Sequence, residues 1–356
     1  MDKKKFISKK VLITGNTGFK GSWLTLWLLK MGARVIGYSK GIPTEPSLFK
    51  ILDLEKDIIQ HYDHVEDLNK LRKVVIDEKP DFIFHLAAQP IVSVSYEDPL
   101  GTFLSNSLGT LNVLEIIRDI DFECKIVMIT SDKSYDNLES LWGYKETDNL
   151  GGKDIYSGSK AAAEMMIKSY FHSFLRNKKN IKISVSRAGN VIGGGDWAKD
   201  RIIVDCFKSW SNKSPVIIRA PYSTRPWQHV LEPLSGYLKT AIKLDENING
   251  EAFNFGPVST EGSTVLDLVS KIYSYWSATK LNEFYKIEST NNFDESKLLK
   301  LNCEKAYHLL NWKPTLNYEK TVSFVGEWYS NFYNGQINMI DYTEKQIELY
   351  EKLSLK

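Results

Sequence analysis

A tyrosine and a lysine four residues apart, Tyr156 and Lys160, are the residues of this sequence that suggest chemistry most directly. In a helix, this spacing places both side chains on one face. A free tyrosine has a pKa of about 10 and is a weak base at neutral pH, but a neighbouring ammonium stabilises its phenolate. The pair can then remove the proton of a bound hydroxyl group. The alternative is a helix in which both residues only pack.

Three polar residues, Ser131, Asp132 and Lys133, directly follow an apolar run at 125–130. A serine hydroxyl can hydrogen-bond the same substrate oxygen as a catalytic tyrosine, and an aspartic acid can protonate a leaving group. A lysine acts as a base only where burial or nearby positive charge lowers its pKa. The segment therefore predicts acid–base chemistry, and the alternative for Asp132 and Lys133 is an ion pair at the surface.

Three glycines at intervals of three, Gly15, Gly18 and Gly21, lie between an apolar run and a helical pattern. The first can make a tight turn, the second lets the backbone approach a diphosphate, and the third lets helix and strand pack closely. Free N–H groups at the start of the helix then bind phosphate. The loop predicts a bound dinucleotide, and the alternative is a glycine-rich turn without a ligand.

The second apolar run ends in Ser39 and Lys40, where an acidic residue would normally bind the adenosine ribose. The next acidic residue along the chain is Glu45. Lys40 either favours a 2′-phosphate or is solvated, so this loop leaves the choice between NAD and NADP open.

Short apolar runs alternate with helical patterns along the first half of the chain, and these elements must position the residues named above. This alternation predicts an α/β fold with a Rossmann-type doubly wound parallel sheet, and runs without strict alternation indicate strands covered on both faces. After about residue 189, loops rich in glycine, proline and tryptophan predict a smaller C-terminal α/β substrate-binding domain. The predicted strands are 10–14, 34–38, 81–86, 125–130 and 181–186, and the predicted helices are 21–31, 67–78, 106–118 and 156–175, with a last helix starting at a capping pattern at Thr343.

We expect residues 1–189 to form the dinucleotide-binding domain, with a return segment around 226–250, and residues 190–225 and 251–356 to form the substrate domain. With 42% hydrophobic and 12% aromatic residues among 356, the chain can bury a substantial core. A formal net charge of +2 gives no reason to expect nucleic acid or a membrane surface as partner. Three dispersed cysteines predict neither a disulfide framework nor a metal site, and no apolar run is long enough to span a membrane. A cytoplasmic protein is expected.

Taken together, these motifs resemble the extended short-chain dehydrogenases/reductases, the family of NAD-dependent epimerases and dehydratases of nucleotide sugars. The resemblance covers nearly the whole chain and implies NAD as cofactor. It rests on the glycine loop, on Tyr156 with Lys160, and on the segments 85–88, 106–110, 187–196, 225–232, 254–257 and 310–314.

Within that family, several segments are similar to the dehydratases that act on CDP-glucose, namely 18–23, 43–49, 88–90, 130–135, 193–197 and 225–229. The resemblance implies oxidation of the hexose at C4, loss of water across C5–C6 and return of hydrogen to C6. In it, Tyr156 is the base at C4, Asp132 the acid at C6 and Lys133 the base at C5. The alternatives are a dehydratase or 4-epimerase for a dTDP-, UDP- or GDP-sugar, and a catalytically silent NAD-binding regulator.

The resemblance also implies binding residues and an assembly. Helices 106–118 and 156–175 are similar to the pair that forms dimers in this family, so a homodimer, or a larger assembly built on it, is expected. Two departures from the family pattern are His64, in place of an aspartate that contacts adenine, and Ile155, in place of a proline. The first predicts a loosely held cofactor. The implied cofactor-binding residues are Gly15, Thr17, Gly18, Phe19, Gly21, Ser39, Lys40, His64, Val65, Leu86, Ala87, Ala88, Tyr156 and Lys160, and the implied substrate-binding residues are Gln89, Ser131, Asn190, Arg201 and Arg225.

Four further residues carry competing interpretations. His85 is expected to be a packed residue at the end of a strand and not a catalyst. Trp142, Trp197 and Trp227 either line the substrate pocket or pack in the core.

Overall fold

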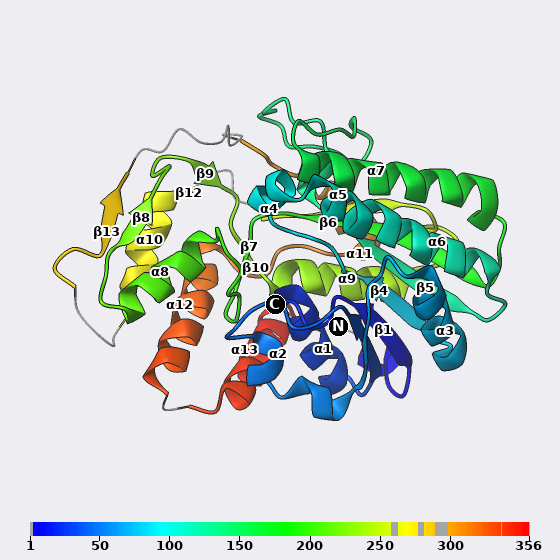
Figure 1. Cartoon of the computed structure of the whole chain (residues 1–356), viewed down its shortest axis with the longest axis horizontal. Coiled ribbons are helices and arrows are strands. Elements are labelled where there is room, and N and C mark those ends of the chain that lie inside the picture. The colour runs from blue at the N-terminus through cyan, green and yellow to red at the C-terminus, as the bar shows by residue number, and fades with distance from the viewer. Residues whose placement is uncertain (1–2, 258–262, 277–280, 289–297, 336, 356) are drawn as a thin grey trace.

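A seven-stranded sheet, in which all neighbouring strands are parallel, forms the centre of the protein (Figure 1). The computed structural model describes residues 3–257, 263–276, 281–288, 298–335 and 337–355. The strand order β11-β6-β5-β4-β1-β2-β3 runs outward in both directions from β1 and β4, so the predicted doubly wound sheet is confirmed. The strands are β1 (Lys10–Thr14), β2 (Arg34–Ser39), β3 (Ile59–Tyr62), β4 (Phe82–His85), β5 (Cys124–Ile129), β6 (Ile181–Ala188) and β11 (Ala252–Phe255).

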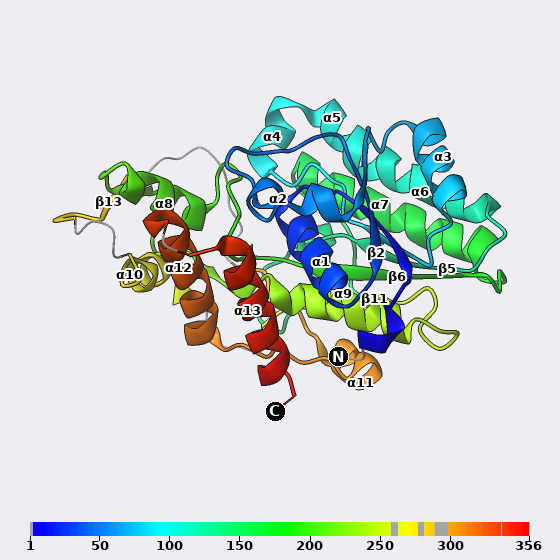
Figure 2. The same cartoon turned by 90° about the horizontal axis from the view of Figure 1, so that it is seen from below.

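Helices cover both faces of this sheet, as the unbroken apolar runs of its strands require (Figure 2). On β1, Val11 and Ile13 belong to one buried cluster and Leu12 belongs to the other. One face carries α3 (Leu68–Glu78), α6 (Gly109–Asp119) and α7 (Ile155–Tyr170), and the opposite face carries α1 (Phe19–Lys30) and α9 (Leu231–Lys243).

The two edge strands, β3 and β11, were not predicted. β3 has the sequence Ile-Gln-His-Tyr and is only partly buried, so it lacks the apolar run that marks a central strand. β11 is four residues long and lies within the range assigned to the substrate domain, yet it pairs with β6 in the main sheet. The segment 226–255 thus contains α9, which packs on one face of the sheet, and β11, which pairs within the sheet.

A smaller region lies beyond the sheet, on the left of Figure 1. It is built around a parallel strand pair and three helices, while the C-terminal helix leaves it and packs against α1. Its main elements are α8 (Ile202–Ser211), β8 (Val216–Ile218), α10 (Val265–Tyr273), β13 (Tyr285–Ile287) and α12 (Tyr318–Asn334), followed by α13 (Met339–Leu353). Further short elements are α2 (Leu48–Ile51), α4 (Val92–Glu97), α5 (Pro99–Phe103), β7 (Val191–Ile192), β9 (Thr224–Arg225), β10 (Gln228–His229), β12 (Ser263–Thr264) and α11 (Glu304–Leu310).

Three predicted helix bounds were wrong. The last helix starts at Met339 and not at Thr343, because Asn338 caps it and Thr343 is buried inside it, donating to the carbonyl of Met339. The helix predicted from 106 begins at 109, after a π-helical turn at Leu104–Leu108. α7 ends at Tyr170, where a second π-helical turn, Phe171–Leu175, replaces the predicted last turn. Among the residues that the structure describes, no helix is long and apolar enough to cross a membrane.

Candidate active site

A cavity of about 1340 Å³ lies where the central strands end and the smaller region begins. Its floor is formed by residues that follow β1, β2, β4, β5 and β6, and its opposite wall by residues 190–220. A crevice outside the carboxyl ends of a doubly wound sheet is the usual ligand site of this architecture. All predicted site residues line this cavity except His64 and Gln89.

The glycine loop has the geometry that a diphosphate needs. Gly15 has a φ of 76°, and a Cβ there would lie 2.8 Å from the backbone nitrogen of Ala87. A Cβ on Gly21 would lie 2.2 Å from the carbonyl oxygen of Gly15. At Gly18, by contrast, the nearest atom is 3.4 Å away, and no side chain caps the helix that starts there. The loop thus keeps its first and third glycines for packing and leaves the second, with the free helix N-terminus, open to a ligand.

The carboxyl end of β2 forms another part of the cavity. The Ser39 hydroxyl donates to Oδ1 of Asn16 at 3.1 Å, and exposed Lys40 lies beside it. Glu66 supplies a carboxylate to the cavity lining, and it accepts a hydrogen bond from Ser105 at 2.6 Å. Sequence reasoning missed this residue. His64 is exposed outside the cavity, its Nδ1 3.7 Å from the Glu66 carboxylate.

Tyr156 and Lys160 line the cavity from α7, and both are buried. Burial raises the pKa of Tyr156, whereas its hydrogen bond with Ser131 and the charge of Arg201 lower it. Burial and the charge of Lys20 lower the pKa of Lys160 to about 8. In the protein without a cofactor, burial outweighs the hydrogen bond and the charge of Arg201, so the pKa of Tyr156 is raised. The downward shift expected with a positively charged nicotinamide in place stays a prediction.

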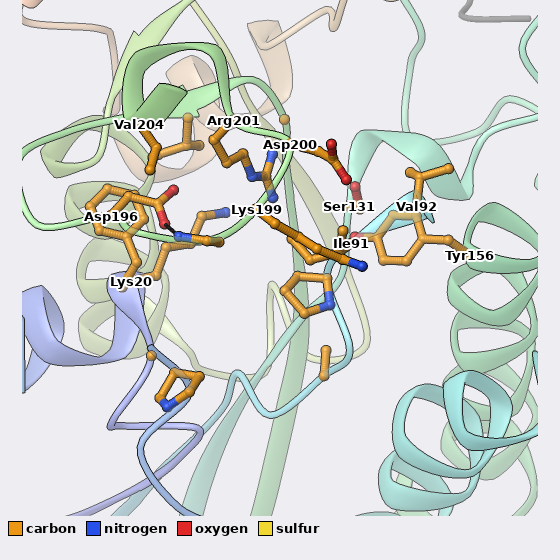
Figure 3. A pocket seen from close by; sticks show the side chains of 18 of the residues that line it. Lys20, Ile91, Val92, Ser131, Tyr156, Asp196, Lys199, Asp200, Arg201 and Val204 are labelled. Atoms are coloured by element: carbon orange, nitrogen blue, oxygen red, sulfur yellow. Dashed lines mark hydrogen bonds between the residues drawn. The ribbon is translucent and has the colours of Figure 1, made fainter. Parts of the chain in front are cut away.

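Ser131 connects Tyr156 to the acid–base pair that follows it. Figure 3 shows Ser131 and Tyr156 side by side at one end of the cavity. The Ser131 hydroxyl donates to Oδ1 of Asp132 at 2.9 Å and accepts from the backbone N–H of Lys133 at 3.2 Å. Asp132 is buried, while Lys133 is only partly buried and faces the cavity. Asp132 and Lys133 therefore both line the cavity, and they do not form an ion pair at the surface.

The segment that carries these residues is held by a buried ion pair that the sequence did not reveal. Arg187 donates from Nε and Nη2 to the two carboxylate oxygens of Glu164, at 2.7 and 2.5 Å. The same carboxylate accepts from Thr130 at 2.6 Å and from Ser134 at 3.2 Å. Residues on both sides of the 131–133 segment are therefore anchored to β6 and α7.

The substrate-side wall carries the predicted Asn190, Arg201 and Arg225. Asn190 has a φ of 51°, the left-handed conformation that asparagine tolerates better than most residues. Figure 3 shows Arg201 close to two residues that sequence reasoning missed, Lys20 and Asp196. Burial raises the pKa of the Asp196 carboxyl, and the charge of Arg201 lowers it.

Several aromatic and polar residues take structural positions instead. His85 is buried between Thr14 and Thr110, and burial lowers its pKa to about 3, so it stays neutral and packed as expected. The amide of Gln89 is used within its own segment, since it donates to Thr102 and accepts from the N–H of Ile91. Trp142 is 88% exposed and outside the cavity, so both interpretations of this residue, pocket lining and core packing, were wrong.

Trp197 and Trp227 do line the cavity, and both also pack against the core. Both interpretations, pocket lining and core packing, therefore apply to each of these two tryptophans.

Comparison with known proteins gives two results for the sequence. A family model described as GDP-mannose 4,6 dehydratase matches residues 12–324. The chain is also 42% identical over 356 residues to the CDP-glucose 4,6-dehydratase of Salmonella typhimurium, covering 98% of each chain. The chain belongs to the extended short-chain dehydrogenase/reductase family. A more distant member, the CDP-paratose 2-epimerase of Salmonella typhi, is 25% identical and covers 90% of this chain and 99% of its own.

Solved structures of extended short-chain dehydrogenases/reductases share the fold. UDP-glucose 4-epimerase of Thermotoga maritima superposes with a TM-score of 0.77 at 21% identity, covering 91% of this chain and 99% of its own. The dTDP-glucose 4,6-dehydratase of Bacillus anthracis, solved in complex with NAD, gives a TM-score of 0.74 at 19% identity, covering 91% and 97%. The family is NAD-dependent, and the open glycine loop with its uncapped helix fits such a dinucleotide.

Proposed function

We propose that this protein dehydrates CDP-glucose to CDP-4-dehydro-6-deoxy-glucose. One observation carries the proposal: Ser131, Asp132 and Lys133 line a single cavity with Tyr156, beside a glycine loop suited to a dinucleotide. A 4-epimerase needs the tyrosine and the serine, but it has no water to eliminate and so no use for a further acid and base. The 42% identity to a CDP-glucose 4,6-dehydratase supports the same activity and the CDP-sugar branch.

The proposed cofactor is NAD, held by the glycine loop, by Lys160 and by the residues at the carboxyl ends of β2 and β4. When bound, NAD supplies the acceptor for the hydrogen that leaves C4 and returns it later to C6. The exposed position of His64 and the lack of an acidic residue at Ser39–Lys40 support loose binding of the adenosine half. Titration of the protein with NAD and NADP tests this, and tighter binding of NADP would contradict the choice.

The residues of the chain have distinct tasks in the three steps. Tyr156 takes the proton of the C4 hydroxyl, and the Ser131 hydroxyl hydrogen-bonds the same oxygen. With C4 a ketone, the proton on C5 becomes acidic and Lys133 removes it. Asp132 protonates the C6 hydroxyl, which leaves as water. These roles are consistent with the four residues all lining the cavity and with the hydrogen bonds that join Ser131 to Asp132 and to the backbone of Lys133.

Binding of the sugar nucleotide is assigned to the opposite wall. Arg201 and Arg225 present guanidinium groups that suit the two phosphates, because a guanidinium can donate two parallel hydrogen bonds. Asn190 would contact the sugar. We propose that residues 190–225 and most of 251–356 form this substrate domain, while residues 1–189 with 226–255 hold NAD.

The function is tested by incubating the protein with NAD and, separately, CDP-, dTDP-, UDP- and GDP-glucose, with mass spectrometry as readout. Loss of one water from CDP-glucose alone, or fastest from CDP-glucose, is the expected result. Faster loss from another nucleotide sugar would reassign the substrate. Epimerisation without loss of water would replace the dehydratase by a 4-epimerase, and NAD binding without any turnover would favour a silent regulator.

A cytoplasmic homodimer is the proposed form of the enzyme. Its support is the set of exposed apolar side chains on the predicted dimer helices and next to them, where an apolar patch indicates an interaction site. Sedimentation at several protein concentrations tests the assembly, and a monomer at all of them would contradict it. The exposed side chains are Leu100, Phe103, Leu104, Met165 and Phe174.

A further inference from the structure

Asp205 is a carboxylate in the cavity to which the proposed reaction gives no task. It lies in the first turn of α8 and lines the wall assigned to the sugar nucleotide. Within the described part of the chain, no group forms an ion pair or a hydrogen bond with this carboxylate. Arg219, whose charge acts on Asp205, is paired with Asp200 instead, at 3.4 Å. The Asp205 carboxylate can therefore accept hydrogen bonds from a ligand.

The surroundings of Asp205 are apolar and partly closed. Val204 on α8 and Ile217 and Ile218 on β8 line the same wall, where the two elements pack against each other. Asp205 itself is partly buried, and this burial raises the pKa of its carboxyl. A hydrogen-bond donor on a ligand would stabilise its charged form. Apolar walls with one strong acceptor suit a flat ring that carries a donor on its edge.

The position of Asp205 along the cavity fits the base of a sugar nucleotide. In the view of Figure 3, Val204 lies beyond Arg201 as seen from Tyr156. The backbone N–H of Asp205 donates to the carbonyl of Arg201 at 2.9 Å, so the two residues are one helical turn apart. One turn is about 5.4 Å. A ligand with its hexose at Tyr156 and its diphosphate at Arg201 therefore brings its base to this part of the wall.

We propose that Asp205 selects cytosine as the base of the substrate, by accepting a hydrogen bond from its exocyclic amino group. The inference rests on the proposed function and deepens it, because it assigns the choice of nucleotide to one side chain. Cytosine and uracil have nearly the same shape, but cytosine carries an amino donor where uracil carries a carbonyl oxygen. A carboxylate accepts from the amino group and repels the carbonyl oxygen.

The test compares the dissociation constants of CDP and UDP, with NAD present, for the parent, Asp205→Asn and Asp205→Leu. The parent should prefer CDP by about tenfold or more, as for a hydrogen bond to a charged group. In Asp205→Asn, the amide can accept from cytosine or donate to uracil, so the preference should nearly vanish. Asp205→Leu should bind CDP more weakly and also lose the preference. The ratio of kcat/KM for CDP-glucose and UDP-glucose should fall in parallel.

Glu66→Gln is the matched control, because Glu66 is a carboxylate of the same cavity that already accepts from Ser105 at 2.6 Å. It should keep the parental ratio of CDP to UDP binding. A parental ratio in both Asp205 variants would overturn the inference. Variants that bind NAD as the parent does, yet bind neither nucleotide, would also overturn it and leave Asp205 a structural role. A parent without preference for CDP would instead contradict the proposed CDP-sugar substrate.

Discussion

Tyr156 is a buried phenol whose pKa is pulled in two directions, up by burial and down by Ser131 and Arg201. Tyr156→Phe removes the hydroxyl but keeps the ring that packs there. We expect turnover to fall by about 100-fold or more, as for a lost general base, while NAD binding stays within a few fold. Steady-state rates and a cofactor titration measure both, and a rate within about tenfold of the parent would remove Tyr156 from the base role.

Lys133 separates oxidation from elimination. In Lys133→Met, the groups proposed for oxidation at C4 are unaltered, and methionine retains much of the length and the apolar stem of lysine. The C5 proton then has no base, so the ketone and reduced nicotinamide should accumulate on the enzyme. Absorbance of the reduced nicotinamide after mixing with CDP-glucose should rise and persist, with no loss of water by mass. Product formation at a near-parental rate would show that Lys133 is a bystander.

At this scale, the sequence predicted those residues that carry a local pattern. Tyr156, Lys160 and the 131–133 segment belong to short motifs, so their shared cavity could be foreseen. Lys20 and Asp196 could not, because nothing in the sequence places a residue of the first helix beside one after β7. Gln89 lies outside the cavity, and its amide is bonded to Thr102 and to the backbone of Ile91, which the sequence did not reveal.

The residue that follows β6, Gly189, makes room for Asp132 because it has no side chain. A Cβ on Gly189 would lie 1.8 Å from Oδ2 of Asp132, so only glycine leaves the carboxylate in place. We expect Gly189→Ala to displace Asp132 and to slow the loss of water by at least about tenfold. Oxidation at C4 should persist, and single-turnover mixing with CDP-glucose can follow it separately.

Gly158→Ala is the control for this variant. It lies between Tyr156 and Lys160 on α7, and its nearest neighbour would be 3.9 Å from the new Cβ. Alanine also stabilises a helix interior relative to glycine. The rate of this control should match that of the parent. Equal rates for both variants would mean that Gly189 does not position Asp132.

The elements themselves were predictable where an apolar run or a helical period was long. The central strands met that condition. β3 did not, because it is only partly buried, and β11 did not, because its apolar run is only four residues long although three of them are buried. The capping pattern at Thr343 was misleading for a different reason. Its hydroxyl accepts from the indole of Trp328 inside the core, a contact 15 residues away that only packing determines.

Glu232 ties distant parts of the molecule together. From α9, its carboxylate accepts hydrogen bonds from the N–H groups of Thr315 and Leu316 and from the hydroxyl of Tyr350 on α13. Burial raises the pKa of Glu232 from 4.5 to about 7, against these hydrogen bonds. The folded protein thus keeps this proton to a higher pH than the unfolded chain does. Stability must fall as the pH rises between those two values, and the loss remains above them.

Glu232→Gln removes this titration while an amide oxygen can still accept from the backbone. The free energy of unfolding of the variant, relative to the parent, should therefore increase between about pH 5 and about pH 8. Urea unfolding at both values measures it. Glu348→Gln, an exposed position on α13, should show no such pH dependence. The prediction fails if the two variants behave alike.

The contact between α1 and α13 has a consequence for the folding of the protein during its synthesis. Trp27 of α1 donates to Glu351, which is synthesised 324 residues later, and Lys30 pairs with Glu344. At about ten residues per second on the ribosome, roughly half a minute separates these partners. During that interval, the helix that begins at the cofactor loop has part of its apolar surface uncovered. The nascent chain therefore passes through a period of exposure to aggregation, and we expect it to depend on chaperones until the last helix has emerged.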